Sequence, residues 1–129
     1  MAELKKEKIY TPDVPPNPKM ISHAVRYGNI ITVSGQVGKT ADGTIPETLE
    51  EQVVQAIENL KRILEAAGAS LDNVMMCQCF LPRQEDFKAM NAVYERYFGA
   101  MEVPPARYTV MAGLANPKLY FEIAAIAGV

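Results

Sequence analysis

Apolar residues recur along this chain in two different periods, and the change from one period to the other predicts its strands and helices. Two alternating segments, residues 21–27 and 30–34, flank Gly28 and Asn29, which both tolerate positive φ. We therefore expect a β-hairpin there. The first 18 residues end in a proline-rich stretch that is typical of a surface segment, and polar residues 39–44 predict a loop or the tip of a second, shorter hairpin.

The helical period appears twice. Thr48 and Glu51 have the spacing of a capping box, and Gly68 is expected to end the helix that they open. Its apolar stripe consists of Leu49, Val53, Ile57, Leu60, Leu64 and Ala67. A second helix is expected over about residues 84–98, with Gly99 as its stop. The residues expected to face inward from it are Phe87, Met90, Tyr94, Tyr97 and Phe98.

Three further apolar runs predict strands. Residues 74–81 are apolar on both alternations, which favours an internal strand, and Pro82 ends it. Strands near residues 107–112 and 119–127 complete a ββαβαββ order, which predicts an α+β fold with one sheet and both helices on one face. The chain, residues 1–129, is expected to form a single domain. Because the other face of the sheet would be uncovered, we expect a homo-oligomer.

Composition and charge narrow the classes of function. The chain is 49% hydrophobic and 22% charged with a net charge of −2, and its only basic cluster lies near the N-terminus. This balance makes nucleic acid an unlikely partner, since nucleic-acid-binding proteins usually present a strongly basic face. No apolar stretch is long enough to span a membrane, and residues 1–6 lack the apolar core of a secretory signal, so we expect no membrane association and a cytoplasmic location.

The cysteines and the histidine favour structural roles. Cys77 and Cys79 alternate on one predicted strand, where their spacing disfavours a disulfide, and no second cysteine pair or histidine cluster completes a metal site. We interpret them as buried thiols, with a redox or nucleophilic role as the lesser alternative. His23 is the single histidine, and packing explains such a residue more often than catalysis does.

Glu122 is the one charged residue in the apolar run from residue 119 to 129. A carboxylate in an apolar setting is costly unless it is paired, and partial desolvation raises its pKa, which is the profile of a general base. Arg107 begins another apolar segment. It could form a structural ion pair with Glu122, or it could bind a substrate carboxylate, for which the planar guanidinium is suited.

Other polar residues lie in unexpected places. Asn91 shares the inward stripe of the second predicted helix, where its amide either ties a loop or helix end to the core or lines a ligand site. Ser34 and Gly35 end an apolar strand. They either form a turn or offer a hydroxyl and an accessible N–H to a ligand.

Taken together, several short motifs resemble one known family. In order and spacing, Val33-Ser-Gly-Gln36, Glu65-Ala-Ala-Gly68, Asp86-Phe-Lys-Ala-Met-Asn91, Pro105-Ala-Arg107 and Phe121-Glu-Ile123 are similar to the Rid family of reactive enamine/imine deaminases, also known as YjgF/YER057c/UK114. The resemblance covers the chain from about residue 20. It implies a chorismate-mutase-like fold of the bacillus type, with a mixed sheet, assembled as a homotrimer around a central barrel with three sites between subunits.

The resemblance also implies an activity and a set of site residues. Arg107 would bind the carboxylate of a small 2-imino or 2-enamino acid, such as 2-iminopropanoate or 2-aminoacrylate, and Glu122 would position or activate a water. Ser34, Gly35 and Asn91 would line or support the cleft. The products would be a 2-oxo acid and ammonia, and no metal or organic cofactor is implied.

The chain departs from the family at two cleft positions. Where deaminating members commonly carry Gly-Pro-Tyr, this sequence reads Lys19-Met20-Ile21, so Ile21 replaces an aromatic hydroxyl unless Tyr27, Tyr108 or Tyr120 supplies one. Thr109 stands where relatives often have cysteine. Two other hypotheses therefore remain beside the deaminase: a non-catalytic small-carboxylate-binding or regulatory protein, and an endoribonuclease or translation inhibitor, which the acidic balance disfavours.

Overall fold

The computed structural model describes residues 3–129. Its strands and helices follow one another as β1 (Glu7–Ile9), β2 (Ala24–Tyr27), β3 (Ile30–Val37), α1 (Leu49–Ala66), β4 (Val74–Leu81), α2 (Phe87–Phe98), β5 (Ala106–Met111) and β6 (Glu122–Gly128). Short 3₁₀ turns, η1 (Leu71–Asn73) and η2 (Gln84–Asp86), precede β4 and α2. The predicted ββαβαββ order is therefore present, with one extra strand at the start.

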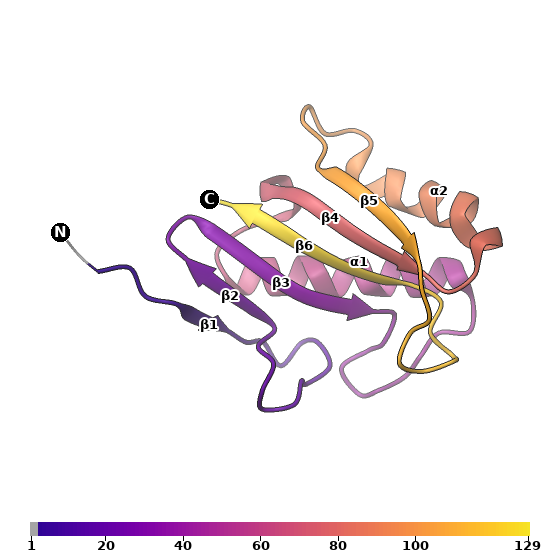
Figure 1. Cartoon of the computed structure of the whole chain (residues 1–129), viewed down its shortest axis with the longest axis horizontal. Helices are drawn as coiled ribbons and strands as arrows, with labels where there is room; N and C mark the ends of the chain where they lie inside the picture. Colours follow the sequence, from indigo (N-terminus) through magenta and orange to yellow (C-terminus); the bar gives the residue numbers. More distant parts are fainter. Residues whose placement is uncertain (1–2) are drawn as a thin grey trace.

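The strands form a single mixed sheet in the order β1-β2-β3-β6-β4-β5. All neighbours are antiparallel except β4 and β5, which are parallel and joined through α2. Both helices lie behind the sheet in Figure 1, and the face toward the viewer carries no helix. The predicted α+β fold, with two helices on one face and β4 as an internal strand, is confirmed.

Local sequence signals account for the limits of α1. The Thr48 hydroxyl accepts a hydrogen bond from the Glu51 N–H (3.2 Å), which satisfies one of the free donors of the first turn. At the other end Gly68 has a φ of +79°, and the Ala69 N–H reaches back to the Leu64 carbonyl (2.8 Å). This is the closing geometry of a Schellman motif, so the predicted start and stop are both confirmed.

The core lies between the helices and the covered face of the sheet. Alternate residues of β6, namely Ile123, Ala125 and Ala127, are buried there, as are Cys77, Cys79 and Leu81 of β4. From α2 the fully buried side chains are Met90, Val93 and Phe98. The prediction that Phe87 faces inward is wrong: it is 38% exposed, because it occupies the first turn of α2 beyond the edge of the core, and Val93 takes up the core position.

The starts of β2 and β6 and the end of β3 differ from the sequence prediction. The first hairpin strand starts at Ala24 instead of residue 21, because the Ile21 N–H closes a turn onto the Pro18 carbonyl (2.9 Å). The last strand starts at Glu122 instead of residue 119. Ser34 and Gly35 do not form a turn; they lie inside β3 at a bulge, where the register against β6 shifts between Val33 and Gln36.

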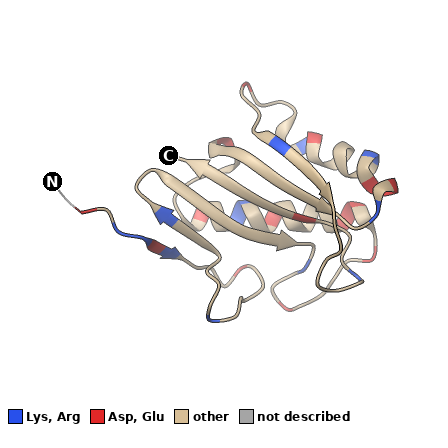
Figure 2. Cartoon of the chain, in the orientation of Figure 1, with Lys and Arg blue, Asp and Glu red and all other residues tan. Residues whose placement is uncertain are grey.

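The uncovered face of the sheet is apolar. Ile30, Tyr108 and Val110 are each more than 40% exposed on it. Figure 2 shows that the internal strands carry few charged residues, whereas the helices and the N-terminal segment carry many. No helix between residues 3 and 129 is long and apolar enough to cross a membrane.

Candidate functional site

Arg107 and Glu122 lie on opposite faces of the sheet. Across β4, Arg107 is paired with Cys77 and Glu122 with Phe80. Residues paired across strands share a face, and residues three apart on one strand do not, so the two side chains point in opposite directions. The ion pair considered from the sequence is not formed: within the described part of the chain the one ion pair joins Arg83 and Asp86.

Arg107 lies on the helix side, at the edge strand β5. Its guanidinium carbon is 4.7 Å from the centre of the Tyr94 ring and 6.0 Å from that of Phe87, both on α2. A cavity of ≈ 300 Å³ opens beside it; the lining residues are Asn91, Tyr94, Glu95, Phe98, Gly99, Pro104 and Arg107. An aromatic surface under a guanidinium holds it by a cation–π contact and leaves its N–H groups directed to a ligand.

Two buried hydroxyl groups lie on the same face as Arg107. Among the described residues, the Tyr94 hydroxyl and the Thr109 hydroxyl have no hydrogen-bond partner in good geometry, although the Cys77 thiol is next to Tyr94. Burial raises the pKa of Tyr94, and the adjacent thiol raises it further. Buried polar groups without partners are rare and often mark places where a ligand or water completes the bonding. Tyr94 was predicted only as an inward-facing core residue. Its place beside Arg107 in the candidate site was missed, and the signal for it was the accumulation of aromatic residues on one stripe of α2.

Glu122 lies on the uncovered face in an apolar row. Its cross-strand partners are Val37 on β3 and Phe80 on β4, and Val110 of β5 follows Phe80 in the same row. Burial among these neighbours raises the pKa of Glu122. Since no residue in 3–129 forms an ion pair with it, the carboxylate is available to a water or a ligand, as a general base must be.

Gly35 makes room for this carboxylate. A Cβ at position 35 would lie 2.7 Å from Glu122 Oε2 and 2.9 Å from its Cδ, so a larger residue there would displace the carboxylate from this position. The bulge in β3 therefore brings backbone against the Glu122 side chain. Gly35 and Glu122 form one half of the candidate site.

Four further predicted site residues come from α2, from β3, from the turn before β2 and from β5. Asn91 lines the Arg107 cavity, and no hydrogen bond of its amide is found within residues 3–129, so the interpretation as a structural tie is not supported. The Ser34 hydroxyl donates to the Ser22 carbonyl (2.7 Å) next to Gly35. Ile21 is 42% exposed in the turn before β2. Thr109 lies on β5 two residues beyond Arg107.

The histidine and the cysteines are structural. His23 is buried; its Nδ1 accepts from the Thr11 N–H (3.2 Å), Nε2 lies 2.9 Å from the Pro15 carbonyl, and Tyr10 stacks on the ring. Cys77 and Cys79 are free and buried, and desolvation raises the pKa of Cys79 to about 12. Both thiols are therefore poor nucleophiles. The described residues contain no group of three or more His, Cys, Asp or Glu side chains that could hold a metal ion.

The sequence is similar to known proteins over nearly its whole length. The family model described as Endoribonuclease L-PSP matches residues 15–129. A RutC family protein of Saccharolobus solfataricus is 39% identical over 124 residues, which cover 95% of this chain and 97% of that protein.

Solved structures show the same fold. RidA from the Antarctic bacterium Psychrobacter sp. has a TM-score of 0.88 at 31% identity, with 95% of this chain and 99% of that chain covered. TdcF of E. coli, solved with bound serine, has a TM-score of 0.89 at 28% identity, with 95% and 98% covered. The motifs, the fold and these relatives together show that the chain belongs to the Rid (YjgF/YER057c/UK114) family, whose model is described as Endoribonuclease L-PSP.

Proposed function

We propose that the protein hydrolyses small 2-imino and 2-enamino acids, such as 2-iminopropanoate and 2-aminoacrylate, to 2-oxo acids and ammonia. We further propose that it acts in the cytoplasm as a homotrimer, with each site formed by Arg107 of one subunit and Glu122 of the next. The observation that carries the proposal is the placement of these two groups on opposite faces of one sheet. A site that uses both must therefore combine two copies of the chain.

Each half of the site has the properties that this chemistry requires. Arg107 lies over Tyr94 beside a cavity large enough for a three-carbon acid, without a carboxylate partner in residues 3–129. Glu122 has a raised pKa and faces an apolar surface that a second subunit would cover. The related TdcF structure contains serine, a three-carbon amino acid with a carboxylate of the kind that Arg107 would bind.

The reaction follows from these groups. An enamine first tautomerises to the imine, whose C2 carbon is electrophilic. The Arg107 guanidinium binds the substrate carboxylate in a bidentate contact and fixes the position of C2. Glu122 takes a proton from a water while the water oxygen bonds to C2 and the C=N π electrons move to the nitrogen, which then receives that proton from Glu122. The resulting 2-amino-2-hydroxy acid passes its hydroxyl proton through Glu122 to the nitrogen, the C–N bond breaks as the C2=O bond forms, and ammonia leaves the 2-oxo acid. No covalent bond to the protein is needed.

A mixing experiment tests both the activity and the shared site. Arg107→Ala and Glu122→Gln should each abolish most ammonia release from freshly generated 2-aminoacrylate. In trimers reassembled from equal amounts of the two variants, a site between subunits receives an intact arginine and an intact glutamate in about one quarter of cases. About a quarter of wild-type activity should therefore return, whereas a site within one chain predicts no recovery.

Other outcomes identify the competing functions. Binding of pyruvate by calorimetry without turnover of 2-aminoacrylate by the wild-type protein would favour a non-catalytic carboxylate-binding protein. The same titration on Arg107→Ala is the control, since it should lose binding in either case. RNA cleavage that persists after stringent purification and disappears in Glu122→Gln would favour an endoribonuclease.

A further inference from the structure

We propose that two buried amides of α1, Gln52 and Asn59, are positioning residues that fix the Glu122 carboxylate by holding the backbone on both sides of it. This inference rests on the proposed function, in which Glu122 activates the water. Neither residue was singled out from the sequence, although both fall among the apolar positions of α1.

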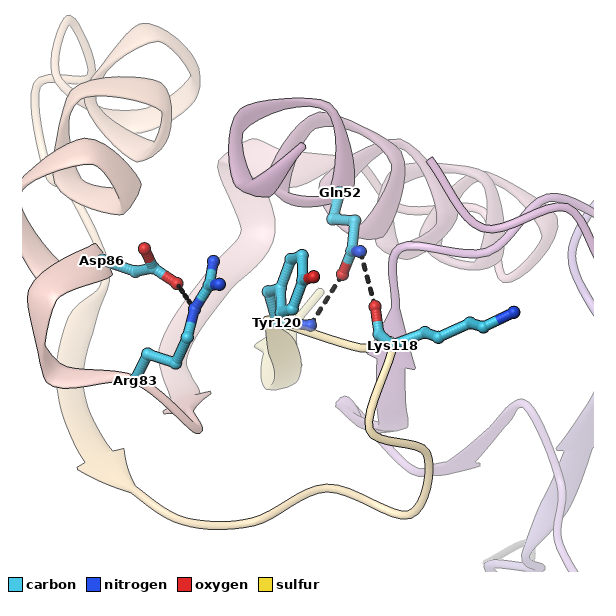
Figure 3. Close-up of polar contacts among 5 residues, drawn as sticks. All are labelled: Gln52, Arg83, Asp86, Lys118 and Tyr120. Atoms are coloured by element: carbon cyan, nitrogen blue, oxygen red, sulfur yellow. Dashed lines mark hydrogen bonds and ion pairs between the residues drawn. The ribbon is translucent and has the colours of Figure 1, made fainter. Parts of the chain in front are cut away.

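Gln52 holds the segment that leads into β6. The side chain is fully buried, and its Nε2 donates to the carbonyls of Pro46 and Lys118, both at 2.9 Å. Its Oε1 accepts from the Tyr120 N–H at 2.7 Å. Figure 3 shows this amide between the start of α1 and the strand entrance. Tyr120 lies two residues before Glu122, so the amide fixes the chain where β6 begins.

The Tyr120 side chain is held from the other side. The guanidinium carbon of Arg83 is 3.8 Å from the centre of the Tyr120 ring, and Arg83 Nε lies 2.7 Å from Asp86 Oδ2 (Figure 3). The entrance to β6 is thus attached to α1 through the Gln52 amide and to the start of α2 through Arg83.

Asn59 holds the strand that pairs with Glu122. It is also fully buried, and its Nδ2 donates to the carbonyls of Lys39 (2.8 Å) and Val37 (3.3 Å). Val37 is the residue opposite Glu122 in the β3–β6 register. The Gln55 amide donates to Asn59 Oδ1 (2.9 Å), which orients the Asn59 side chain.

Close packing joins the two amides into one unit. A Cβ on Gly38 would lie 2.5 Å from the Gln52 Cα, so the chain just after β3 lies directly against α1. In each amide both N–H groups donate and the oxygen accepts one bond, and a buried amide that is removed leaves these partners unsatisfied at a cost. The result is a clamp, defined here as Gln52 and Asn59 with their bonds to residues 37, 39, 46, 118 and 120, around Glu122.

The clamp does not contact the arginine half of the site. Arg107 is on β5, and its aromatic support comes from α2. Loosening the clamp should therefore alter the step that needs Glu122 and leave the binding of the substrate carboxylate nearly intact. A purely structural role would instead reduce stability without a specific effect on the chemical step.

The test uses isosteric apolar variants in the full-length protein. For Gln52→Met and Asn59→Leu we expect kcat to fall by roughly tenfold to a hundredfold with KM changed by less than about threefold, as small displacements of a catalytic group produce. The Glu122 carboxyl, followed by carbon NMR, should titrate at a different pH from wild type. Asn73→Leu is the matched control: Asn73 Nδ2 also bonds the backbone of β6, at Gly128 (3.1 Å), but at the far end of the strand. It should leave kcat and the Glu122 titration unchanged.

Unchanged kcat and unchanged Glu122 titration in the folded clamp variants would overturn the proposal, and so would an equal loss in Asn73→Leu. If neither variant folds, hydrogen exchange on the wild-type protein decides: the Tyr120 N–H, which donates to Gln52, and the Asn59 side-chain amide protons, which donate to the Lys39 and Val37 carbonyls, should exchange as slowly as the core. Rapid exchange at both overturns the clamp. An inactive wild-type protein would refute the proposed function, while the Glu122 titration would still test the positioning.

Discussion

At the scale of the residue, Glu122 combines a cost in stability with the catalytic use that we propose for it. Burial beside Val37 and Phe80 raises its pKa, so the folded state binds a proton more tightly than the unfolded state does. Below the unfolded value of about 4.3 both states are protonated and the cost is absent. As pH rises through the native pKa the carboxyl ionises in its apolar row, and stability decreases.

Glu122→Gln should therefore raise the melting temperature at neutral pH, and the gain should vanish below about pH 4. Thermal unfolding followed by circular dichroism at both values measures it. Activity should show the opposite preference, because the general base must be ionised: in the wild type kcat/KM should fall as pH decreases through a value above 4.3. A gain in stability that is larger at acid pH than at neutral pH would contradict this account.

Gly35 supplies a second prediction at this scale. In Gly35→Ala the new Cβ would meet Glu122 Oε2 at 2.7 Å, and the flexible carboxylate can rotate away without moving backbone. We expect a loss of kcat of roughly a hundredfold with the fold retained. Gly113→Ala is the control, because a Cβ there meets nothing within 4 Å. Steady-state kinetics and circular dichroism of both variants check this; equal kinetics would show that the Glu122 position does not matter.

Only part of the site could be predicted from single residues. Glu122 is visible in the sequence because a charge interrupts an apolar run, and Arg107 because it begins another. Whether the two side chains share a face of the sheet is not visible in the sequence. It depends on which residues of β4 they are paired with, Cys77 for Arg107 and Phe80 for Glu122. That register follows from long-range pairing, which no local pattern encodes.

At the scale of the element, strong local signals predicted both ends of α1, whereas β1 has no such signal and was not predicted. The Thr48 cap and the positive φ of Gly68 fix α1 locally. β1 is a three-residue strand, Glu-Lys-Ile, whose pattern has no distinguishing period. It forms because the chain returns along β2, with Lys8 opposite Val25, and such pairing is decided by tertiary structure.

His23 holds the segment between β1 and β2 in place, which can be tested. Its ring bonds the Thr11 N–H and the Pro15 carbonyl and stacks on Tyr10. In His23→Leu both backbone groups lose a partner, which typically costs about 1–3 kcal/mol for each buried group. We expect faster hydrogen exchange over residues 7–15 with exchange in α1 unchanged. Ser22→Ala, at the neighbouring position, is the control. Unaltered exchange in His23→Leu would show that the proline-rich segment is held by other contacts.

At the scale of the whole molecule, the apolar face of the sheet and the two separated half-sites point to the same assembly. A monomer would expose Ile30, Tyr108 and Val110 together and would leave Arg107 and Glu122 unable to act on one substrate. Covering this face with another copy would remove the exposed surface and bring an arginine to the glutamate. Stability and activity should therefore depend on the same contact.

Val110→Glu tests this dependence. Val110 lies in the same row as Glu122 with Phe80 between them, so a second carboxylate there would be buried in the same apolar row when subunits associate. We expect a smaller species in analytical ultracentrifugation and a parallel loss of ammonia release, both partly restored at low pH, where the new carboxyl is protonated. Ala92→Glu, on the exposed side of α2, should alter neither. Because the substitution leaves Arg107 and Glu122 in place, full activity in a dissociated Val110→Glu protein would mean that one chain holds a complete site, contrary to the register of β4 with its two neighbours.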